Sequence, residues 1–356
     1  MAHTYKGYYD GDYLLSQKDV NGNNPGWFFC CSAERGPGKT TYFSRKLIRQ
    51  YLDHGEQFGL ICRDIGELGR VASGVLNSYL NNSVFDKERP RYECFEVIAQ
   101  KGTYSEIHLA IGEKDEREDN IIGYVLPIRA AEKIKRVSSN FTKIARLFFD
   151  EFQPMQERVY IPNEIDLLTI IFDSIARGDG EQSRYVPIIC SSNTISLGNP
   201  YFTATGLNTK IQSNTRFYKG EGVIFEQVFV EGLSEKHEAN PFHVALRKHE
   251  KRRKSNIWLN DDNALVEKPQ GRGRYICTIE YGGDLVGLLD YSGMWFLSRK
   301  TDDKALATYA TDPATPSKLP QIKTAPIYKE LRDRYYKGRV RVQDAGLQSM
   351  LRDLVA

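Results

Sequence analysis

Short apolar runs alternate with amphipathic stretches over the first two thirds of the chain. The first apolar run, 27–31, is followed by a stretch of helical periodicity over 41–54. The pattern then predicts a strand over 57–63 and a helix over 67–81, whose apolar residues lie on one stripe. Strands that alternate with helices in this way predict a parallel sheet, with ligand chemistry at the carboxyl ends of its strands.

The same alternation continues in the middle of the chain. Residues 91–128 alternate as the strands of hairpins do. A strand over 143–149, a helix over 163–176 and a strand over 186–190 are predicted after them. We expect the side-chain oxygen of Asn163 to cap the helix that it begins.

The pattern changes after about residue 233. Residues 234–262 are charged and helical, 274–298 read as short β-strands separated by glycine turns, and the tail 325–356 is helical. A length of 356 residues also favours two domains over one. The predicted parts are an α/β domain over 1–232, a helical linker or lid over 233–268 and a small α+β domain over 269–356.

A glycine-rich segment lies between the first predicted strand and the first helix. It reads Ala-Glu-Arg-Gly-Pro-Gly-Lys-Thr, which is the phosphate-binding pattern G-x-x-x-x-G-K-[ST] with Ala33 in place of the first glycine. Backbone N–H groups of such a loop bind phosphate oxygens, helped by the positive end of the helix. We expect Lys39 to reach the β- and γ-phosphates of ATP and Thr40 to ligate Mg²⁺; a chance glycine turn before a lysine is the alternative. The predicted nucleotide-binding residues here are Ala33, Glu34, Arg35, Gly36, Pro37, Gly38, Lys39, Thr40 and Thr41.

Two further strand ends carry polar residues. Residues 147–152 read Leu-Phe-Phe-Asp-Glu-Phe, an apolar strand that ends in two acids, as a Walker B strand does. We expect Asp150 to hold Mg²⁺ and Glu151 to act as the general base on the attacking water; a helix-capping acidic pair is the alternative. The next strand ends in Ser192 and Asn193, which either sense the γ-phosphate or form a turn. A single active site requires all three strand ends to converge on one nucleotide.

ATP hydrolysis also needs a cation on the charge that develops at the γ-phosphate. In many ATPases this cation is an arginine from a neighbouring subunit. The candidates are Arg35, Arg63, Lys135, Arg146 and Arg177. Spacing along the chain does not choose among them, and a surface role is the alternative for each.

Composition narrows the class of protein. The chain is 40% apolar and 27% charged, as soluble globular proteins are, and no apolar run is long enough to span a membrane. The N-terminus lacks the basic start and apolar core of a signal peptide. The six cysteines include no C-x-x-C pair, so they read as free thiols of an intracellular protein rather than as disulfides or a zinc site.

Charge is unevenly distributed along the chain. The net charge is only +3, but basic residues cluster at 247–254 and 329–341. Such clusters either contact the phosphates of a nucleic acid or form a solvated helix face. The predicted DNA-binding residues are Lys248, Lys251, Arg252, Arg253 and Lys254.

Several motifs follow one another in a fixed order between residues 27 and 202. They are the phosphate-binding loop at 33–40, Phe-Asp-Glu-Phe at 149–152, Tyr-Ile-Pro-Asn-Glu at 160–164, Ser-Asn at 192–193 and Asn-Pro-Tyr-Phe at 199–202. With this set the chain resembles the DNA packaging (encapsidation) ATPases of phi29-type tailed bacteriophages. The resemblance continues more weakly over 279–296. The phosphate-binding loop is generic, whereas the other motifs are much more specific to that family.

The resemblance has consequences for the fold and for the site residues. It implies an α/β P-loop NTPase of the additional-strand type, related to the FtsK and HerA translocases, with a parallel-rich central sheet and with ATP and Mg²⁺ as cofactors. The C-terminal domain would be similar to an inactive RNase H-like nuclease that contacts nucleic acid. Alignment places Arg177 on the trans-acting arginine finger of the family and Lys135 on a second trans-acting basic residue. The loop after Arg177, at 178–183, is longer here than in the family.

The resemblance also implies partners and a place of action. The chain would form a homopentameric ring at the portal, or connector, vertex of an empty prohead and push double-stranded DNA inward. A structural packaging RNA can join such a motor to the capsid. The motor would work in the host cytoplasm, away from membranes, and would be absent from the mature virion.

Two other functions remain open at this point. A complete terminase with an active C-terminal nuclease needs metal-binding acids, and Glu280, Asp284, Asp290 and Asp344 do not have the spacing of a two-metal site. A non-motor P-loop ATPase, such as a small-molecule kinase, needs an arginine-rich lid, for which the sequence has no clear signal. Magnesium-dependent nicking and DNA-stimulated ATP hydrolysis separate these functions from a packaging motor.

Overall fold

Two compact units make up the chain. The computed structural model describes residues 3–83, 94–100, 102–110, 120–154, 160–177, 180, 182–245, 265–281, 284–302, 307–311 and 319–355. The first unit comprises Met1–Asn193 and Arg216–Glu250, and the second comprises Thr194–Thr215 and Lys251–Ala356. The predicted domain boundaries at 232 and 268 stay a prediction.

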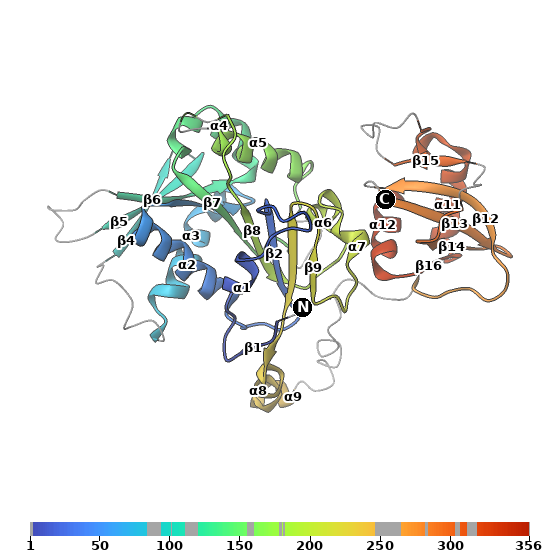
Figure 1. Cartoon of the computed structure of the whole chain (residues 1–356), viewed down its shortest axis with the longest axis horizontal. Coiled ribbons are helices and arrows are strands. Elements are labelled where there is room, and N and C mark those ends of the chain that lie inside the picture. Colours follow the sequence, from blue (N-terminus) through green and yellow to red (C-terminus); the bar gives the residue numbers. More distant parts are fainter. Residues whose placement is uncertain are drawn as a thin grey trace. The chain divides into compact units, whose positions relative to one another are not determined.

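The first unit is built on a mixed, nine-stranded sheet (Figure 1). In spatial order its strands are β4 (Cys94–Gln100), β5 (Tyr104–Ala110), β6 (Asn120–Pro127), β3 (Gln57–Cys62), β7 (Ile144–Asp150), β8 (Ile188–Asn193), β2 (Trp27–Ser32), β10 (Val223–Val228) and β9 (Phe217–Lys219). The strands from β6 to β10 are parallel to one another, and β4, β5 and β9 pair antiparallel at the edges. The predicted α/β fold with a parallel-rich sheet is confirmed.

Helices cover both faces of this sheet. Helices α2 (Lys39–His54) and α3 (Leu68–Leu80) lie on one face, and α4 (Ala131–Lys135) and α5 (Glu164–Ala176) lie on the other (Figure 1). Because side chains alternate along a strand, Phe28 and Cys30 of β2 join the core beneath α2 and α3. Phe29 points the opposite way and packs against Phe152, with ring centroids 5.3 Å apart.

The start of α5 differs from the prediction that Asn163 caps it. The backbone of Asn163 is left-handed, with φ 57°, and its side chain makes no capping hydrogen bond. A capping side chain works from an extended backbone at that position, so the left-handed conformation removes the geometry that the cap needs. Instead, the Glu164 carboxylate accepts a hydrogen bond from the backbone N–H of Ile161 at 2.8 Å.

The N-terminal segment is part of the first unit. Strand β1 (Tyr5–Lys6) pairs in parallel with β11 (Val230–Glu231), and the short helix α1 (Asp12–Leu15) follows it. Tyr5 and Tyr9 are both only 3% exposed. Their hydroxyls donate hydrogen bonds to Glu226 of β10, at 2.6 and 3.1 Å. Tyr5 and Tyr9 therefore fix the N-terminal segment to β10, the strand that pairs with β2.

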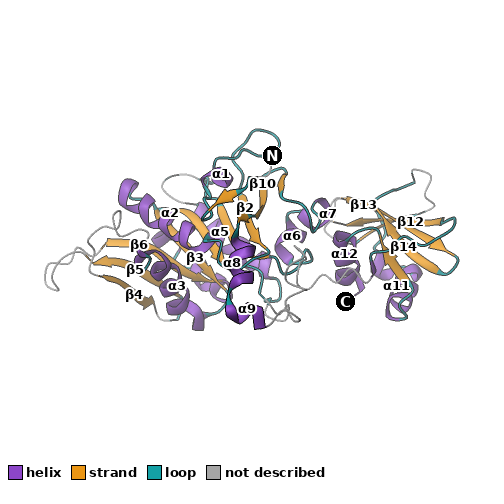
Figure 2. Ribbon diagram, turned by 90° about the horizontal axis from the view of Figure 1, so that it is seen from below, coloured by secondary structure: helices purple, strands orange, loops and turns teal. Residues whose placement is uncertain are grey.

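The second unit carries a smaller sheet (Figure 2). Its strands in spatial order are β15 (Thr308–Ala310), β12 (Arg274–Tyr281), β13 (Asp284–Tyr291), β14 (Met294–Ser298) and β16 (Val340–Val342), and its helices include α6 (Pro200–Ala204), α7 (Leu207–Lys210), α11 (Pro326–Tyr336) and α12 (Ala345–Val355). The predicted helical tail is confirmed for α11 and α12. Strand β16 between them was not predicted; it pairs with β14 because Val340 and Val342 bury their side chains in the core of this unit.

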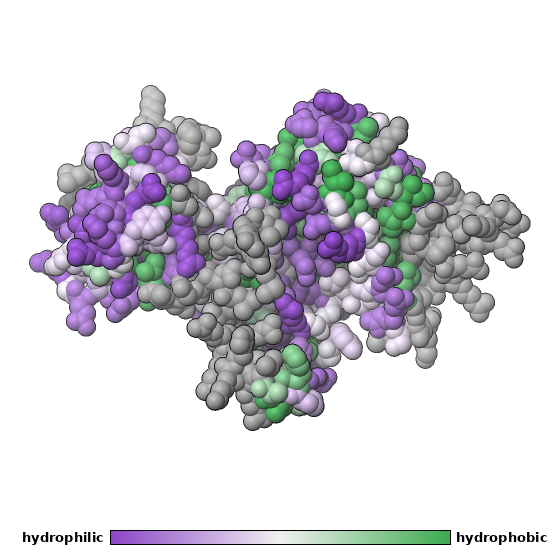
Figure 3. Space-filling view, turned by 180° about the vertical axis from the view of Figure 1, so that it is seen from behind, coloured by the Kyte–Doolittle hydropathy of each residue, from purple (hydrophilic) through white to green (hydrophobic). Residues whose placement is uncertain are grey.

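Two short helices end the described part of the first unit. Helices α8 (Leu233–Ala239) and α9 (Pro241–Ala245) follow β11. Phe242 and Val244 of α9 are 67% and 39% exposed. Figure 3 shows hydrophobic side chains gathered over this end of the molecule, at the bottom of the view.

Among the helices that the structure describes, none is long and apolar enough to cross a membrane.

Candidate nucleotide-binding site

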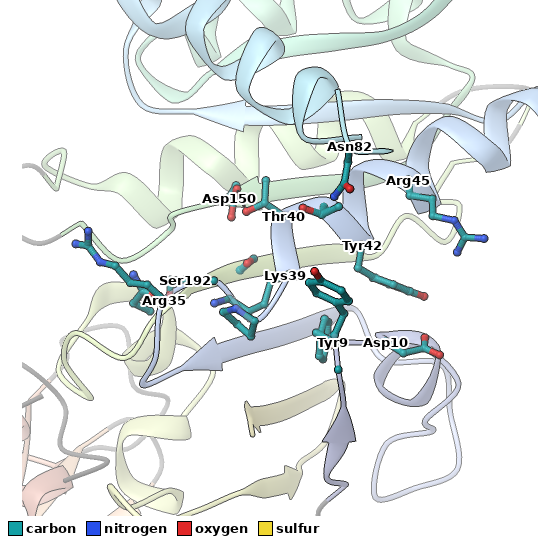
Figure 4. Close-up of a pocket in the computed structure, with 18 of the residues that line it drawn as sticks. Tyr9, Asp10, Arg35, Lys39, Thr40, Tyr42, Arg45, Asn82, Asp150 and Ser192 are labelled. Atoms are coloured by element: carbon teal, nitrogen blue, oxygen red, sulfur yellow. Dashed lines mark hydrogen bonds between the residues drawn. The ribbon is translucent and has the colours of Figure 1, made fainter. Parts of the chain in front are cut away.

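A cavity of about 790 Å³ opens at the carboxyl ends of β2, β7 and β8 (Figure 4). Its walls include the phosphate-binding loop from Arg35 onward and the first turn of α2. Asp150 and Glu151 contribute from the end of β7, and residues 191–193 contribute from the end of β8. The three strand ends therefore converge on one cavity, as a single active site requires.

The phosphate-binding loop places a buried cation at the start of a helix. Gly36 and Gly38 have φ 80° and 101°, a conformation that glycine adopts without strain and that gives the loop its tight path. Lys39 follows, and its ammonium group donates a hydrogen bond to Ser32 Oγ. Burial lowers the pKa of Lys39, and the neighbouring Cys30 and Asp150 oppose this shift. A buried ammonium at a helix N-terminus favours the binding of an anion such as phosphate.

Thr40 and Asp150 bring two oxygen ligands together. The Thr40 hydroxyl donates a hydrogen bond to Asp150 Oδ2 at 2.6 Å, across 110 residues of sequence. Burial raises the pKa of Asp150, whereas the hydrogen bond from Thr40 and the charge of Lys39 lower it. A hydroxyl and a carboxylate at this distance are the hard oxygen donors that Mg²⁺ prefers, so the donor set fits that ion.

Glu151 occupies a sharp turn directly after the Walker B strand. Its φ is 53°, which is uncommon for a residue with a side chain. Its backbone N–H donates to Asp150 Oδ1 at 3.1 Å, and its side chain is exposed at the cavity. The turn therefore directs the two carboxylates to different places: Asp150 toward Thr40, and Glu151 into the open cavity.

Arg63 stabilises this turn through hydrogen bonds to its backbone. Its guanidinium donates to the backbone oxygens of Phe152, at 2.5 Å, and Glu151, at 3.4 Å. It forms a buried ion pair with Glu164 at 2.9 Å and lies over the ring of Tyr160, 5.1 Å from the centroid. The motifs at 149–152 and 160–164 thus meet on one arginine at the end of β3. The sequence did not predict this role. Arg63 was a candidate for the cation at the γ-phosphate, but its guanidinium is bound by groups of its own chain.

The other candidate cations lie in different places. Arg35 is exposed and lines the cavity. Arg146 pairs with Glu56 at 2.5 Å and is not among the cavity residues. Lys135 and Arg177 are exposed at the ends of α4 and α5, also outside the lining of this cavity as far as the structure describes it.

The remaining predicted nucleotide-binding residues divide into two groups. Pro37, Thr41, Ser192 and Asn193 line the cavity, whereas Ala33 and Glu34 come before the lining begins. Ser192 is buried, with its hydroxyl 3.6 Å from Cys31 Sγ. The predicted DNA-binding residues Lys248, Lys251, Arg252, Arg253 and Lys254 lie outside the described residues.

Several lining residues had no signal in the sequence. They are residues 6–10 and Asp12 of the N-terminal segment, Tyr42 and Arg45 of α2, and Asn82 after α3. Helical spacing puts Arg45 near Thr41 and Tyr42 on α2. This spacing is the sequence signal from which Arg45 could have been predicted to line the site.

The fold and this site define a P-loop ATPase. A phosphate-binding loop lies between a strand and a helix, and an acidic pair follows a parallel strand of the same sheet. Comparisons with known proteins narrow this class.

The family model described as Podovirus DNA encapsidation protein (Gp16) matches residues 6–319. The DNA packaging protein of Bacillus phage B103 is 28% identical over 257 residues, 71% of each chain. That of Bacillus phage phi29 is 25% identical over 257 residues, 71% of this chain and 69% of the relative. The chain belongs to the podovirus DNA encapsidation protein family, and the resemblance predicted from the sequence is confirmed.

Solved structures share the fold over nearly the whole chain. One is the bacteriophage Phi-29 viral genome packaging motor assembly, with a TM-score of 0.61, 20% identity and 98% coverage of each chain. Another is the Phi-28 gp11 DNA packaging motor, with a TM-score of 0.54, 17% identity and coverage of 98% of this chain and 96% of that one. The prediction of a phage DNA packaging ATPase agrees with both the family and the fold.

Proposed function

We propose that this protein is an ATP-driven motor that moves double-stranded DNA into a preformed prohead. The contact of Thr40 with Asp150 carries the proposal, because at 2.6 Å it joins the phosphate-binding helix to the Walker B strand beside the buried Lys39. Membership of the DNA encapsidation family, together with similarity to DNA packaging proteins of Bacillus phages, supports DNA as the cargo.

In this proposal ATP hydrolysis uses groups from three strand ends. Lys39 and the backbone N–H groups of the loop hold the phosphates, and Ser192 and Asn193 lie beside the γ-phosphate. Thr40 and Asp150 would hold Mg²⁺, which when bound supplies positive charge to the phosphate oxygens. Glu151 accepts the proton of the attacking water, and Arg63 keeps the turn that aims it.

We take β8 as the additional strand of this ATPase class. It pairs with β2 on one side and with β7 on the other, so it separates the strand before the phosphate-binding loop from the Walker B strand. This position places Ser192 and Asn193 between the loop and the acidic pair, where they can report which nucleotide is bound.

Arg177 and Lys135 act, in this proposal, on the nucleotide of a neighbouring subunit. Both are exposed, and they end two helices that pack against each other, α5 and α4. Neither lines the described cavity of its own subunit, and an exposed basic pair of this kind can reach the γ-phosphate only from outside. A ring, a homopentamer by family resemblance, would give every site the neighbour that this proposal requires.

The second unit is proposed to be an inactive nuclease-like domain that contacts nucleic acid. The Asp344 carboxylate accepts hydrogen bonds from Nε and Nη2 of Arg299, at 2.7 and 3.0 Å, and Asp284 accepts hydrogen bonds from Thr209 and Lys210. Two of the four acids considered as metal ligands, Asp284 and Asp344, are thus engaged by cations and, at Asp284, by a hydroxyl. Within the described ranges no group of three His, Cys, Asp or Glu residues could hold a metal ion.

The remaining partners are proposed from the family. The motor would sit at the portal vertex of the prohead, with a structural packaging RNA as a further contact, and would work in the host cytoplasm. DNA contacts are proposed for the basic cluster 247–254.

ATP hydrolysis with and without double-stranded DNA tests the proposal. Purified protein should release phosphate faster when unrelated duplexes are added, and it should leave supercoiled plasmid intact in Mg²⁺. An ATPase rate indifferent to DNA would contradict the motor, and magnesium-dependent nicking would replace it by a terminase with an active nuclease.

A further inference from the structure

The nucleotide cavity has a wall that the phosphate chemistry does not use. This wall comprises residues 6–10 and Asp12 of the N-terminal segment, together with Tyr42 and Arg45 of α2. We propose that it binds the nucleoside part of the nucleotide and that the ring of Tyr8 stacks on the base. The inference rests on the proposed function only in requiring that the phosphate-binding loop holds a nucleoside triphosphate.

The segment 6–12, called here the N-terminal strap, is held in place at both ends. Before it, β1 pairs with β11. At its last residue, the Asp12 carboxylate accepts hydrogen bonds from the Tyr42 hydroxyl and the Lys46 ammonium, each at 2.7 Å. Both donors belong to α2, the helix that follows the phosphate-binding loop, so the strap and the loop are fixed to the same element.

A third anchor joins the middle of the strap to the loop itself. The backbone N–H of Tyr9 donates to the backbone oxygen of Pro37 at 2.8 Å. The Tyr9 hydroxyl donates to Glu226 of β10, the strand next to β2. Gly7, with φ 83°, makes the turn that brings the chain from β1 to this position. Because the strap is fixed by these contacts within the protein, it presents a wall whose ordering costs little on binding.

Tyr8 carries the exposed aromatic ring of this wall. It is 65% exposed, whereas Tyr5 and Tyr9 on either side are 3% exposed. Its ring lies against the phosphate-binding loop, since a β-carbon placed on Gly38 would be 3.5 Å from Tyr8 Cδ1. An aromatic ring that borders a cavity from a fixed backbone offers a face on which a base can stack.

The orientation that the nucleotide must take along the cavity also places its base near Tyr8. In Figure 4, Arg35, Ser192 and Asp150 lie on one side of Lys39, and Asp10, Tyr42 and Arg45 lie on the other. The γ-phosphate belongs beside the acidic pair, so the nucleoside must point away from it, toward the strap. Asp10 and Arg45 supply polar groups at that end, where the ribose hydroxyls need hydrogen-bond partners.

Binding of ATP and of inorganic tripolyphosphate, measured by calorimetry on the purified full-length chain, separates the two ends of the site. Tyr8→Ala should weaken ATP binding by about 5- to 150-fold, the range expected for one stacked base, and leave tripolyphosphate binding unchanged. Tyr8→Phe should keep both affinities because the ring remains. Tyr185→Ala, which removes a 52% exposed tyrosine outside the cavity, should also keep both.

Each other result has a distinct meaning. Normal ATP binding by Tyr8→Ala overturns the stacking role. Equal loss of ATP and tripolyphosphate also overturns it, because the strap would then only support the loop. Lys39→Ala should abolish the binding of both ligands. If it binds both as the parent does, the proposed function fails; if it binds neither while Tyr8→Ala binds ATP normally, only the role of Tyr8 fails.

Discussion

Lys39 and Glu151 act on the same nucleotide at different steps. Lys39→Ala should abolish ATP binding because the phosphates lose their buried cation, the ammonium group that donates a hydrogen bond to Ser32 Oγ. Glu151→Gln should bind ATP as the parent does and lose turnover, because an amide cannot accept the proton of the attacking water. Calorimetry and phosphate release measure the two effects. Normal hydrolysis by Glu151→Gln would exclude Glu151 as the base.

Arg63 should matter for stability as well as for turnover. The side chains of Arg63 and Glu164 in this ion pair are only 8% and 1% exposed. Arg63→Ala therefore leaves the buried Glu164 carboxylate without its cation. We expect the free energy of unfolding to fall by about 3–5 kcal/mol, measured by urea denaturation. In Arg129→Ala, the matched control, the pair with Asp64 is 50% and 56% exposed, and the expected loss is about 0–1 kcal/mol. Equal losses in the two variants would contradict the supporting role of Arg63.

At the scale of helices and strands, periodicity predicted what is local. The helices at 41–54 and 67–81 and the strands around the acidic pair follow from runs of apolar residues, and the structure has them within a few residues. Contacts between distant segments could not be predicted. The pairing of Arg63 with Glu164 spans 101 residues, and the strap reaches the loop through Tyr9 and Pro37. Such contacts depend on strand order, which a single sequence does not encode in its periodicity.

Strand β10 makes the first unit sensitive to pH. Burial raises the pKa of Glu226 from 4.5 to about 7, partly offset by the hydrogen bonds from Tyr5 and Tyr9. A carboxyl group whose pKa is higher in the folded state binds its proton more tightly there. Its contribution is therefore complete below pH 4.5 and is lost as the pH rises to about 7, by on the order of 3 kcal/mol.

Glu226→Gln tests this strand directly. The amide keeps an oxygen for the tyrosine hydroxyls but does not ionise, so the variant should be more stable than the parent at pH 8 and should lose this part of the pH dependence. Urea denaturation at pH 5 and pH 8 gives the comparison. A parent protein whose stability does not fall between these values, apart from changes shared by the variant, would show that Glu226 ionises freely.

At the scale of the whole molecule, a packaging motor must accept any DNA sequence. Contacts should therefore be made with phosphates, and the logarithm of affinity should fall linearly with the logarithm of salt concentration, by about 0.9 for each phosphate neutralised. Arg252→Ala or Arg253→Ala should each reduce the slope by about 1. Strong preference among unrelated duplexes at fixed salt would contradict this, as would an unchanged slope in both variants.

The central claim is that each ATP site of the ring is completed by Arg177 of the neighbouring subunit. Arg177→Ala should bind ATP normally and hydrolyse almost none, since an arginine finger contributes about 10³–10⁵ in rate. The direct measurement is the DNA-stimulated ATPase rate of Arg177→Ala mixed with Glu151→Gln. Where the first variant supplies the site and the second supplies the arginine, both groups are intact, so activity should reappear although each protein alone is inactive. An Arg177→Ala protein as active as the parent, or an inactive one that mixing never restores, would contradict the claim.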